Sequence, residues 1–366
     1  MSSGPAPCST PRPLHPVVIW FGRVGDMIML TALLEILHLR FGSACRVIGA
    51  GSWSREIYAA HPDVAETLWI RRYTLFAIDL RWWRTVRKLR RGRHDPVYVC
   101  ETDPHKLARI SRLLRFAGID RARCVYLSDD PVSLAQVHWV DRLVSLGRCT
   151  PSAFHAADYP WPEPPPHGAP RLVVSPAARA AGERWIRAHD LQDRTLVLLQ
   201  PGNRRTMRGR SLRIKDSDDR FWPVERWVEL IQRLHARLPE ARIVLCGAPR
   251  ETALLGWIET AAALPRVVLR GLPFPGSFAL CARAHSMISI DTGTAHAAAA
   301  LGLPLVVLFG ATPPAQVKPR SANGSPVIGV GEAPHLGRVD RISVEAVFEA
   351  WSSLPAVRAA DATTAG

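Results

Sequence analysis

The chain carries at 289–300 the sequence Ser289-Ile290-Asp291-Thr292-Gly293-Thr294-Ala295-His296 followed by four alanines, and at 301–314 the sequence LGLPLVVLFGATPP. The apolar run at 287–291 predicts a buried strand, Asp-Thr-Gly a tight turn, the alanines a helix, and 304–309 a second strand. We expect Gly293 to take a positive φ and to let a ligand approach the backbone closely. Backbone N–H groups and small hydroxyls at such a helix start favour a phosphate or a diphosphate. The stretch therefore predicts an α/β unit that holds a nucleotide tail.

A purely structural interpretation of this stretch stays open. Gly293 then only makes the turn, Thr294 only caps the helix, and residues 297–300 only allow close packing on a sheet. An isolated Asp-Thr-Gly favours that interpretation, because such short patterns are common. Two further segments favour the binding site.

The first of these segments is Asp218-Asp219-Arg220-Phe221-Trp222-Pro223-Val224-Glu225-Arg226-Trp227. Pro223 suits a first helical turn. Four apolar residues then recur at helical spacing and predict one buried face: Trp227, Leu230, Ile231 and Leu234.

The second segment runs from Val17 to Ile28 and reads VVIWFGRVGDMI. It predicts a strand, a glycine turn and a helix from about Asp26 to Arg40. The buried stripe of this helix would hold Ile28, Leu30, Leu33, Leu34 and Leu37. From the residues alone, Asp26 could simply cap the helix or favour its positive end.

Together, the three segments resemble those of the bacterial heptosyltransferases, the lipopolysaccharide-core glycosyltransferases with the two-lobed GT-B fold. The resemblance implies that Asp26 is the general base and that Gly25 and Lys106 lie where the acceptor binds. It also implies a set of nucleotide-sugar-binding residues: Asn203, Arg220, Glu251, Asp291, Thr292, Gly293, Thr294 and His296. Glu251 would accept a ribose hydroxyl, although a first-turn helix carboxylate is an equal alternative. For Lys106, a plain surface lysine is the alternative.

The chain departs from the family at several positions. The family usually carries Lys where Arg220 stands, and Arg binds a phosphate as a planar fork instead of a point charge. The proline usually found after Gly-Asp is absent from Thr31-Ala32-Leu33, and Phe21-Gly22-Arg23-Val24 replaces small polar residues. A basic insertion, RRTMRGRSLRIK, occupies 204–215. These differences leave the acceptor, and with it the donor sugar, open.

Composition describes a soluble globular protein of two domains, with 366 residues, 47% of them hydrophobic and 22% charged. The uncharged stretch Ala295–Ala315 is broken by glycine and proline, so we expect no membrane span there. The first 16 residues are rich in proline without an apolar core, and we expect no secretory signal. The 7 cysteines form no Cys-x-x-Cys pair and the 13 histidines no HExxH. We therefore expect reduced thiols in the cytoplasm and no metal.

The excess of basic residues, 47 Lys+Arg against 32 Asp+Glu, is concentrated between Arg71 and Arg123. As a helix, residues 79–93 would place Leu80, Trp83, Val86 and Leu89 or Arg90 near one face and cations elsewhere. That pattern is typical of a helix on an anionic membrane surface, and an ordinary solvated basic face is the equal alternative. No nucleic-acid-binding motif accompanies the charge.

The order of apolar runs and amphipathic segments predicts two Rossmann-like lobes with mostly parallel sheets. The first alternation has strands at 17–21, 46–50, 66–70, 96–100 and 123–127, and helices near 26–40, 75–91, 106–117 and 133–147. The second has strands at 195–200, 242–247, 267–270, 287–291, 304–309 and 326–330, and helices near 223–238, 250–263, 276–285, 295–301 and 343–354.

Between the two alternations lies a proline-rich stretch at 159–170, followed by a helix near 177–189. We therefore expect an acceptor-binding lobe at 14–157, a linker with a bridging helix at 158–193, a nucleotide-sugar-binding lobe at 194–354 and a disordered tail at 355–366. Residues 1–13 are expected to be a second disordered tail.

The resemblance implies an inverting, metal-independent enzyme without a cofactor. It would move heptose from ADP-L-glycero-D-manno-heptose to the inner core on lipid A, at the inner face of the inner membrane. The Thr292–Thr294 backbone, Arg220 and Lys215 would neutralise the departing diphosphate. Two alternatives remain: a related transferase that uses another nucleotide sugar, and a non-catalytic membrane-associated protein that binds one. A Rossmann dehydrogenase fits less well, because no GxGxxG follows the first strand.

Overall fold

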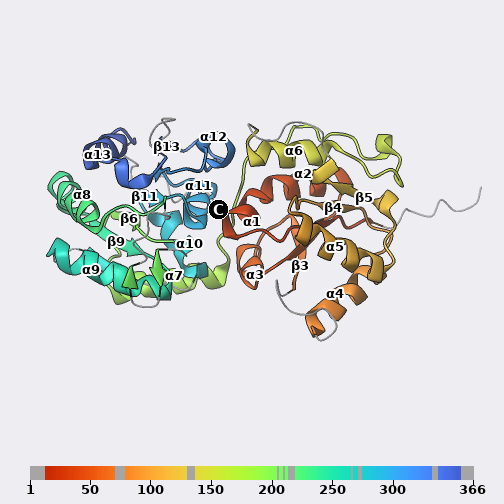
Figure 1. The fold of residues 1–366 in the computed structure, drawn as a ribbon, viewed down its shortest axis with the longest axis horizontal. Helices are drawn as coiled ribbons and strands as arrows, with labels where there is room; N and C mark the ends of the chain where they lie inside the picture. Colours follow the sequence, from red (N-terminus) through yellow and green to blue (C-terminus); the bar gives the residue numbers. More distant parts are fainter. Residues whose placement is uncertain are drawn as a thin grey trace, which may run out of the picture.

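The computed structural model describes residues 13–70, 79–129, 137–203, 206–208, 211–212, 219–264, 267–270, 274–331 and 337–355. Two α/β lobes lie side by side, the N-terminal lobe in red to yellow and the C-terminal lobe mainly in green to blue (Figure 1). Their sheets are parallel, as the alternation of strands and helices predicts.

The N-terminal lobe has a five-stranded sheet in the order β3-β2-β1-β4-β5. Its strands are β1 (Val17–Ile19), β2 (Cys45–Gly49), β3 (Val64–Trp69), β4 (Val97–Val99) and β5 (Cys124–Tyr126). Its helices are α1 (Val24–Met29), α2 (Thr31–Phe41), α3 (Trp53–Ile57), α4 (Leu80–Arg91), α5 (Pro104–Ala117) and α6 (Trp139–Arg148). In the central strand β1, all three residues are buried, because helices cover both faces of the sheet.

The C-terminal lobe has a six-stranded sheet in the order β10-β9-β6-β11-β12-β13. Its strands are β6 (Leu196–Gln200), β9 (Arg242–Cys246), β10 (Val267–Arg270), β11 (Ser286–Ile290), β12 (Leu305–Leu308) and β13 (Val327–Val330). Its helices are α8 (Val224–Arg237), α9 (Thr252–Ala262), α10 (Phe274–Arg283), α11 (Gly293–Ala300), α12 (Pro314–Val317) and α13 (Val344–Ser352). Short 3-10 helices span Arg121–Arg123, Leu127–Asp129, Ala156–Asp158, Pro249–Glu251 and Val339–Arg341.

Most elements agree with the sequence prediction, with three differences. The helix predicted at 26–40 begins at Val24 and is divided into α1 and α2 at Leu30. Neither α3 nor α12 was predicted, and the basic insertion contains a small antiparallel hairpin, β7 (Met207–Arg208) with β8 (Ser211–Leu212). Residues 75–78 and 133–136 of the predicted helices, the rest of the insertion and the chain ends at 1–12 and 356–366 lie outside the described residues.

The segment with the Trp-Pro pair folds as its pattern predicts. Pro223 stands at the N-cap of α8, and the predicted apolar face of that helix is buried. Trp222 packs edge-on against Trp227, with ring centroids 4.8 Å apart, and its Nε1 donates to the Ile342 carbonyl at 2.9 Å. Truncating one of these tryptophans to alanine would cost about 3–5 kcal/mol of folding free energy.

The prediction that Leu80, Trp83, Val86 and Leu89 or Arg90 share one face of the basic helix α4 is wrong. Trp82, Val86 and Leu89 are buried against the sheet, whereas Leu80 is 84% and Trp83 39% exposed. The two tryptophans differ by one position, or about 100° around the helix. Packing against β3 and α5 decides which of them is buried. The alternative of an ordinary solvated basic helix therefore holds for Trp82, Val86 and Leu89, which pack inside. Leu80 and Trp83 remain on the surface.

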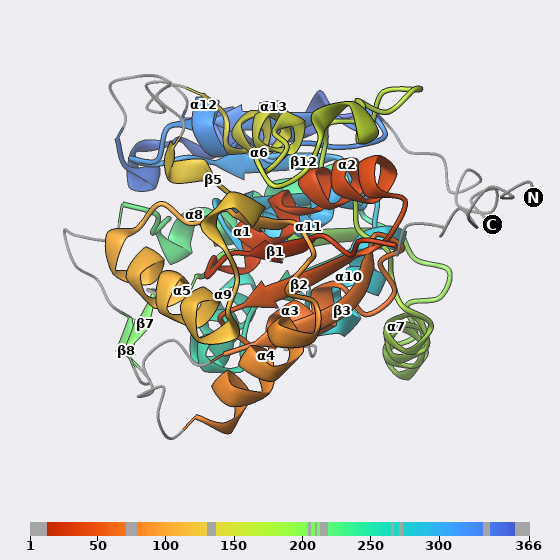
Figure 2. The same cartoon turned by 90° about the vertical axis from the view of Figure 1, so that its right-hand side faces the viewer.

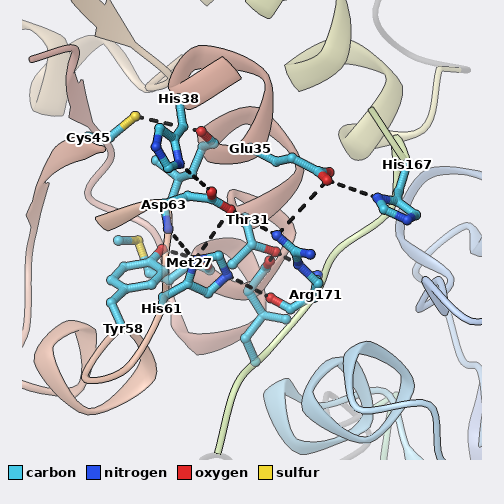
Figure 3. A network of polar contacts seen from close by, with 12 residues as sticks. Met27, Thr31, Glu35, His38, Cys45, Tyr58, His61, Asp63, His167 and Arg171 are labelled. Atoms are coloured by element: carbon cyan, nitrogen blue, oxygen red, sulfur yellow. Dashed lines mark hydrogen bonds and ion pairs between the residues drawn. The ribbon is translucent and has the colours of Figure 1, made fainter. Parts of the chain in front are cut away.

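Helix α7 (Pro176–Ala188) connects the lobes and packs against α10. The linker before it is fastened to the N-terminal lobe by a polar network (Figure 3). In this network, His167 Nδ1 lies 2.8 Å from Glu35 Oε1, and Arg171 Nη2 lies 3.3 Å from Asp63 Oδ2. The next residue, Leu172, donates its N–H to the Ala300 carbonyl of the C-terminal lobe at 3.2 Å. The linker thus contacts both lobes within two consecutive residues.

The lobes share an apolar interface. One core cluster includes Met27 and Ile28 of α1 together with Phe278 of α10 and Ala297 and Ala300 of α11. At its edge, Arg320 of the C-terminal lobe binds Asp141 of α6 through two bonds of 2.5 and 2.7 Å. His138 Nε2 lies 2.9 Å from the Lys318 carbonyl. The two lobes are therefore in direct contact in the described structure. The limits of lobes and linker stay predictions from the sequence.

Candidate active site between the lobes

Each sheet has a point where the strand order reverses, and loops diverge there to form a crevice. In the N-terminal lobe this point lies between β1 and β4, so the segments that carry Asp26 and Glu101 are neighbours. In the C-terminal lobe it lies between β6 and β11, which brings Asn203 close to the Asp291–Thr294 turn. The sheet topology therefore gathers the residues predicted for the site at facing edges of the two lobes.

A cavity of about 620 Å³ lies at this place. A volume of that size suits a small organic ligand. The wall contains seven of the predicted site residues: Asn203, Arg220, Glu251, Asp291, Thr292, Gly293 and Thr294. It also contains residues that the sequence did not single out, among them Arg23, Val24, Gly247, Phe274 and Ser277. Lys215 lies outside the described residues.

The Asp-Thr-Gly turn begins helix α11, with Thr292 as its N-cap. The Thr292 hydroxyl accepts from the Ala295 N–H at 3.4 Å, so Thr292 and not Thr294 is the capping residue. The expected positive φ at Gly293 is wrong, because Gly293 is not among the described residues that have a positive φ. The need for glycine at this position comes instead from the lack of space around it. A Cβ on Gly293 would lie 2.7 Å from Val24 Cγ1 of the opposite lobe.

Arg220 fixes the turn from the side. Its Nη1 donates to the Asp291 carbonyl at 3.0 Å, and its Nη2 lies 3.0 Å from Asp291 Oδ2 and 2.8 Å from Thr312 Oγ1. Asp291 is buried, and the ion pair compensates its charge. Arg220 thus stands in the cavity wall, where the turn already uses much of its hydrogen-bonding capacity. Thr312 lies in the Ala-Thr-Pro sequence that ends the quoted stretch, but nothing local marks it as a partner of Arg220.

Glu251 is a buried carboxylate on the far side of the cavity. Burial raises the pKa of Glu251, and the Ala248 N–H, which donates to its Oε2 at 2.8 Å, opposes that shift. The carboxylate therefore closes a turn before α9 and at the same time lines the cavity. Nearby, the Asn203 N–H donates to Thr206 Oγ1 at 2.9 Å.

His296 does not line the cavity. It is buried beneath the turn in α11, and burial lowers the pKa of His296 to about 4, so the ring is neutral at pH 7. The ring fills the space beside Gly25, where a Cβ would lie 2.9 Å from its Cδ2. In this arrangement, His296 and Gly25 are neighbours at the lobe interface, and their predicted binding roles stay predictions.

Asp26 lies in the first turn of α1, two residues after Val24, and is not itself among the described residues that line the cavity. Its Oδ2 accepts from the Arg23 N–H at 2.6 Å. Burial raises the pKa of Asp26 above its usual range, while that hydrogen bond and the charges of Arg23 and Lys106 lower it. A carboxylate with a raised pKa is a stronger base than an exposed one.

Lys106 and Glu101 form an ion pair whose charges act on Asp26. Lys106 Nζ lies 3.3 Å from Glu101 Oε2, and Glu101 Oε1 accepts from the N–H groups of Thr102 and Asp103 at 3.1 Å. Glu101 is buried and its charge is compensated. Asp103 instead caps α5, and the Lys106 N–H that it accepts lowers the pKa of Asp103. Lys106 is therefore more than a free surface lysine, because an ion pair fixes it close to Asp26.

Comparison with known proteins agrees with this geometry. The model of glycosyltransferase family 9 (heptosyltransferase) matches residues 138–343, more than half of the chain. Lipopolysaccharide heptosyltransferase 1 of Pseudomonas aeruginosa is 28% identical over 289 residues, which cover 71% of this chain and 68% of that protein.

Solved structures show the same fold. Escherichia coli ADP-heptose lipopolysaccharide heptosyltransferase II is similar with a TM-score of 0.69 at 20% identity, and the match covers 93% of this chain and 98% of that one. An Escherichia coli heptosyltransferase solved with ADP is similar with a TM-score of 0.61 at 17% identity, over 93% and 99% of the two chains.

Two α/β lobes, each with a parallel sheet, that face each other across a cavity define a glycosyltransferase of the GT-B fold. The chain belongs to glycosyltransferase family 9, the heptosyltransferase family, and is an enzyme of that class. Among the helices of the described residues, none is long and apolar enough to cross a membrane.

Proposed function

We propose that this enzyme transfers heptose from ADP-heptose to a sugar hydroxyl of a lipopolysaccharide core, with inversion and without a metal ion. The observation that carries the proposal is the position of Asp26. Asp26 of one lobe stands two residues after Val24, which lines a cavity whose other wall contains the Asp291–Thr294 turn of the second lobe. A base on one side and an anion-binding turn on the other are the two groups that a single displacement requires.

In the proposed step, the Asp26 carboxylate takes the proton of the acceptor hydroxyl. The hydroxyl oxygen attacks the anomeric carbon, and the bond from that carbon to the diphosphate oxygen breaks on the opposite face. The diphosphate leaves with the bonding electron pair. The N–H groups at the start of α11 and nearby arginines stabilise the negative charge on it. Lys106, paired with Glu101, would bind an anionic group of the acceptor.

A thermal-shift series with ADP, UDP, GDP and CMP tests the donor site, because a ligand that binds the folded state raises the melting temperature. Transfer assays with ADP-heptose and a purified core acceptor then test the reaction. We expect ADP to give the largest shift and heptosyl transfer to be detectable. A larger shift with another nucleotide would favour a related transferase with a different donor. Binding without any sugar release would favour a non-catalytic protein.

We further propose that the enzyme associates with the inner face of the inner membrane through α4 and α5, which lie side by side (Figure 2). Neither helix contains an acidic residue. Trp83 packs edge-on against Phe116 of α5, with centroids 5.6 Å apart, and the two rings are 39% and 36% exposed. Exposed rings among arginines such as Arg84 and Arg87 suit an interface with anionic lipid.

Sedimentation with lipid vesicles tests this association, with phosphatidylcholine alone compared with a mixture containing phosphatidylglycerol. We expect binding to the anionic vesicles only, which weakens as salt rises. Trp83→Ser should weaken it, whereas the control Trp257→Ser should not, since Trp257 on α9 of the other lobe is similarly exposed at 41%. Equal loss in both variants, or binding that ignores lipid charge, would contradict the assignment.

A further inference from the structure

The N-terminal lobe contributes Arg23 and Val24 to the wall of the cavity. The other described residues of the cavity wall belong to the C-terminal lobe. Arg23 stands directly before α1, and its side chain is exposed. It adds a cation to the cavity from the lobe opposite the Asp291–Thr294 turn.

The cations of the cavity wall are not equivalent. Arg220 is paired with Asp291, so its charge is largely compensated within the protein. Arg250 follows Pro249 and acts on the buried Glu251 beside it. Within the described residues, no carboxylate lies at ion-pair distance from the side chain of Arg23 or of Arg250. Arg23 differs from both other arginines of the wall because it comes from the N-terminal lobe.

The backbone at Arg23 also lies close to the anion-binding turn. A Cβ on Gly293 would lie 3.1 Å from the Gly25 nitrogen, so the chain two residues after Arg23 contacts the start of α11. An arginine side chain is long enough to reach from that point over the turn. A doubly charged group seated on the N–H groups of Thr292–Thr294 would therefore lie within its reach.

We propose that the Arg23 guanidinium binds the diphosphate of the donor across the lobe boundary. This inference rests on the proposed function, because the anion is the nucleoside diphosphate that the enzyme releases. The planar guanidinium donates two parallel hydrogen bonds to phosphate oxygens. The guanidinium would stabilise the negative charge that develops on the diphosphate as the sugar departs. It would also link binding of the nucleotide in the C-terminal lobe to the position of the N-terminal lobe.

A second consequence of the same charge concerns the base. Arg23 lies close enough to Asp26 for its positive charge to lower the pKa of that carboxyl. One side chain would therefore bind the leaving group and favour the ionised form of the base. Loss of the charge has two separate readouts, diphosphate affinity and the pH dependence of turnover.

Calorimetric titration of the full-length enzyme tests the contact. The ligands are ADP, UDP and GDP, then the monophosphate that matches the diphosphate bound most tightly, and inorganic pyrophosphate. Arg23→Gln should weaken binding of the diphosphate about tenfold or more, because the charge-assisted hydrogen bonds to the phosphate oxygens are lost. The monophosphate should lose much less, and Arg23→Lys should retain part of the affinity. Arg55→Gln, which removes an exposed arginine of α3 outside this cavity, is the matched control.

The results separate this inference from the proposed function. If the wild-type enzyme binds none of the three nucleoside diphosphates, the proposed function fails. If the wild type binds one and Arg23→Gln binds it equally well, only the role of Arg23 fails. An equal loss of affinity for the diphosphate and for the monophosphate in Arg23→Gln would also overturn the proposed role of Arg23. Arg23→Gln should in addition move the acid limb of the kcat/KM profile to higher pH, a change that a merely structural arginine would not cause.

Discussion

Gly293 of one lobe faces Gly25 of the other so closely that a Cβ on Gly293 would lie 3.1 Å from the Gly25 nitrogen. The absence of a side chain at both positions allows the starts of α11 and α1 to meet at the cavity. The anion-binding turn and the segment of the base therefore share one contact. Any residue larger than glycine at this point separates them.

Replacing Gly293 with Ala should weaken catalysis through this contact. The new Cβ would lie 2.7 Å from Val24 Cγ1, so Val24 or the whole lobe must shift. We expect kcat/KM to fall about tenfold, corresponding to about 1.4 kcal/mol. Gly256→Ala in α9 is the control, because a Cβ there has no neighbour within 4 Å. Wild-type kinetics in Gly293→Ala would show that the close approach is not required.

Asp26→Asn should preserve the fold and abolish most of the turnover. The amide has the same size and can still accept the Arg23 N–H, but it cannot take a proton from the acceptor hydroxyl. We expect kcat to fall by about two orders of magnitude or more, with the diphosphate affinity nearly unchanged. Single-turnover kinetics with calorimetry measure both quantities. Near wild-type turnover would assign the base elsewhere, with Glu101 the first carboxylate to examine.

The pH dependence of kcat/KM should report the raised pKa of Asp26. The carboxyl must be ionised to act as a base, so activity is lost as the pH falls through its pKa. Burial places that acid limb above the usual range for aspartate. Lys106 lowers the pKa of Asp26 by its charge, so Lys106→Met should move the limb to higher pH. A profile identical to that of the wild type would mean that Asp26 is not the titrating group.

His296 should make folding stability depend on pH. Burial lowers its pKa to about 4 in the folded state, whereas the unfolded chain binds the proton near the ordinary value of 6.5. The contribution is therefore complete above about pH 6.5 and is lost as the pH falls toward 4, by about 3 kcal/mol in total. Melting temperatures of the wild type and His296→Gln between those pH values measure it. The slope should be smaller in the variant, and parallel curves would contradict the assignment.

The sequence alone determined the elements whose signal is local. The stretch around Asp291 predicts strand, turn, helix and strand, and β11, α11 and β12 agree with it to within about two residues. The buried face of α8, which includes Trp227 and Leu234, was likewise predicted from helical spacing. Periodicity and turn chemistry act between residues a few positions apart, so they can be read without knowledge of the fold.

Only the tertiary structure decided the relations between distant segments. It selected Trp82 over Trp83 for the core, because the buried side of α4 depends on the sheet and on α5. It paired Arg220 with Asp291, 71 residues further along the chain. It also brought Arg23 into a cavity formed mainly by the other lobe. Such contacts follow from how two sheets and their helices pack together, and no local pattern of residues encodes that packing.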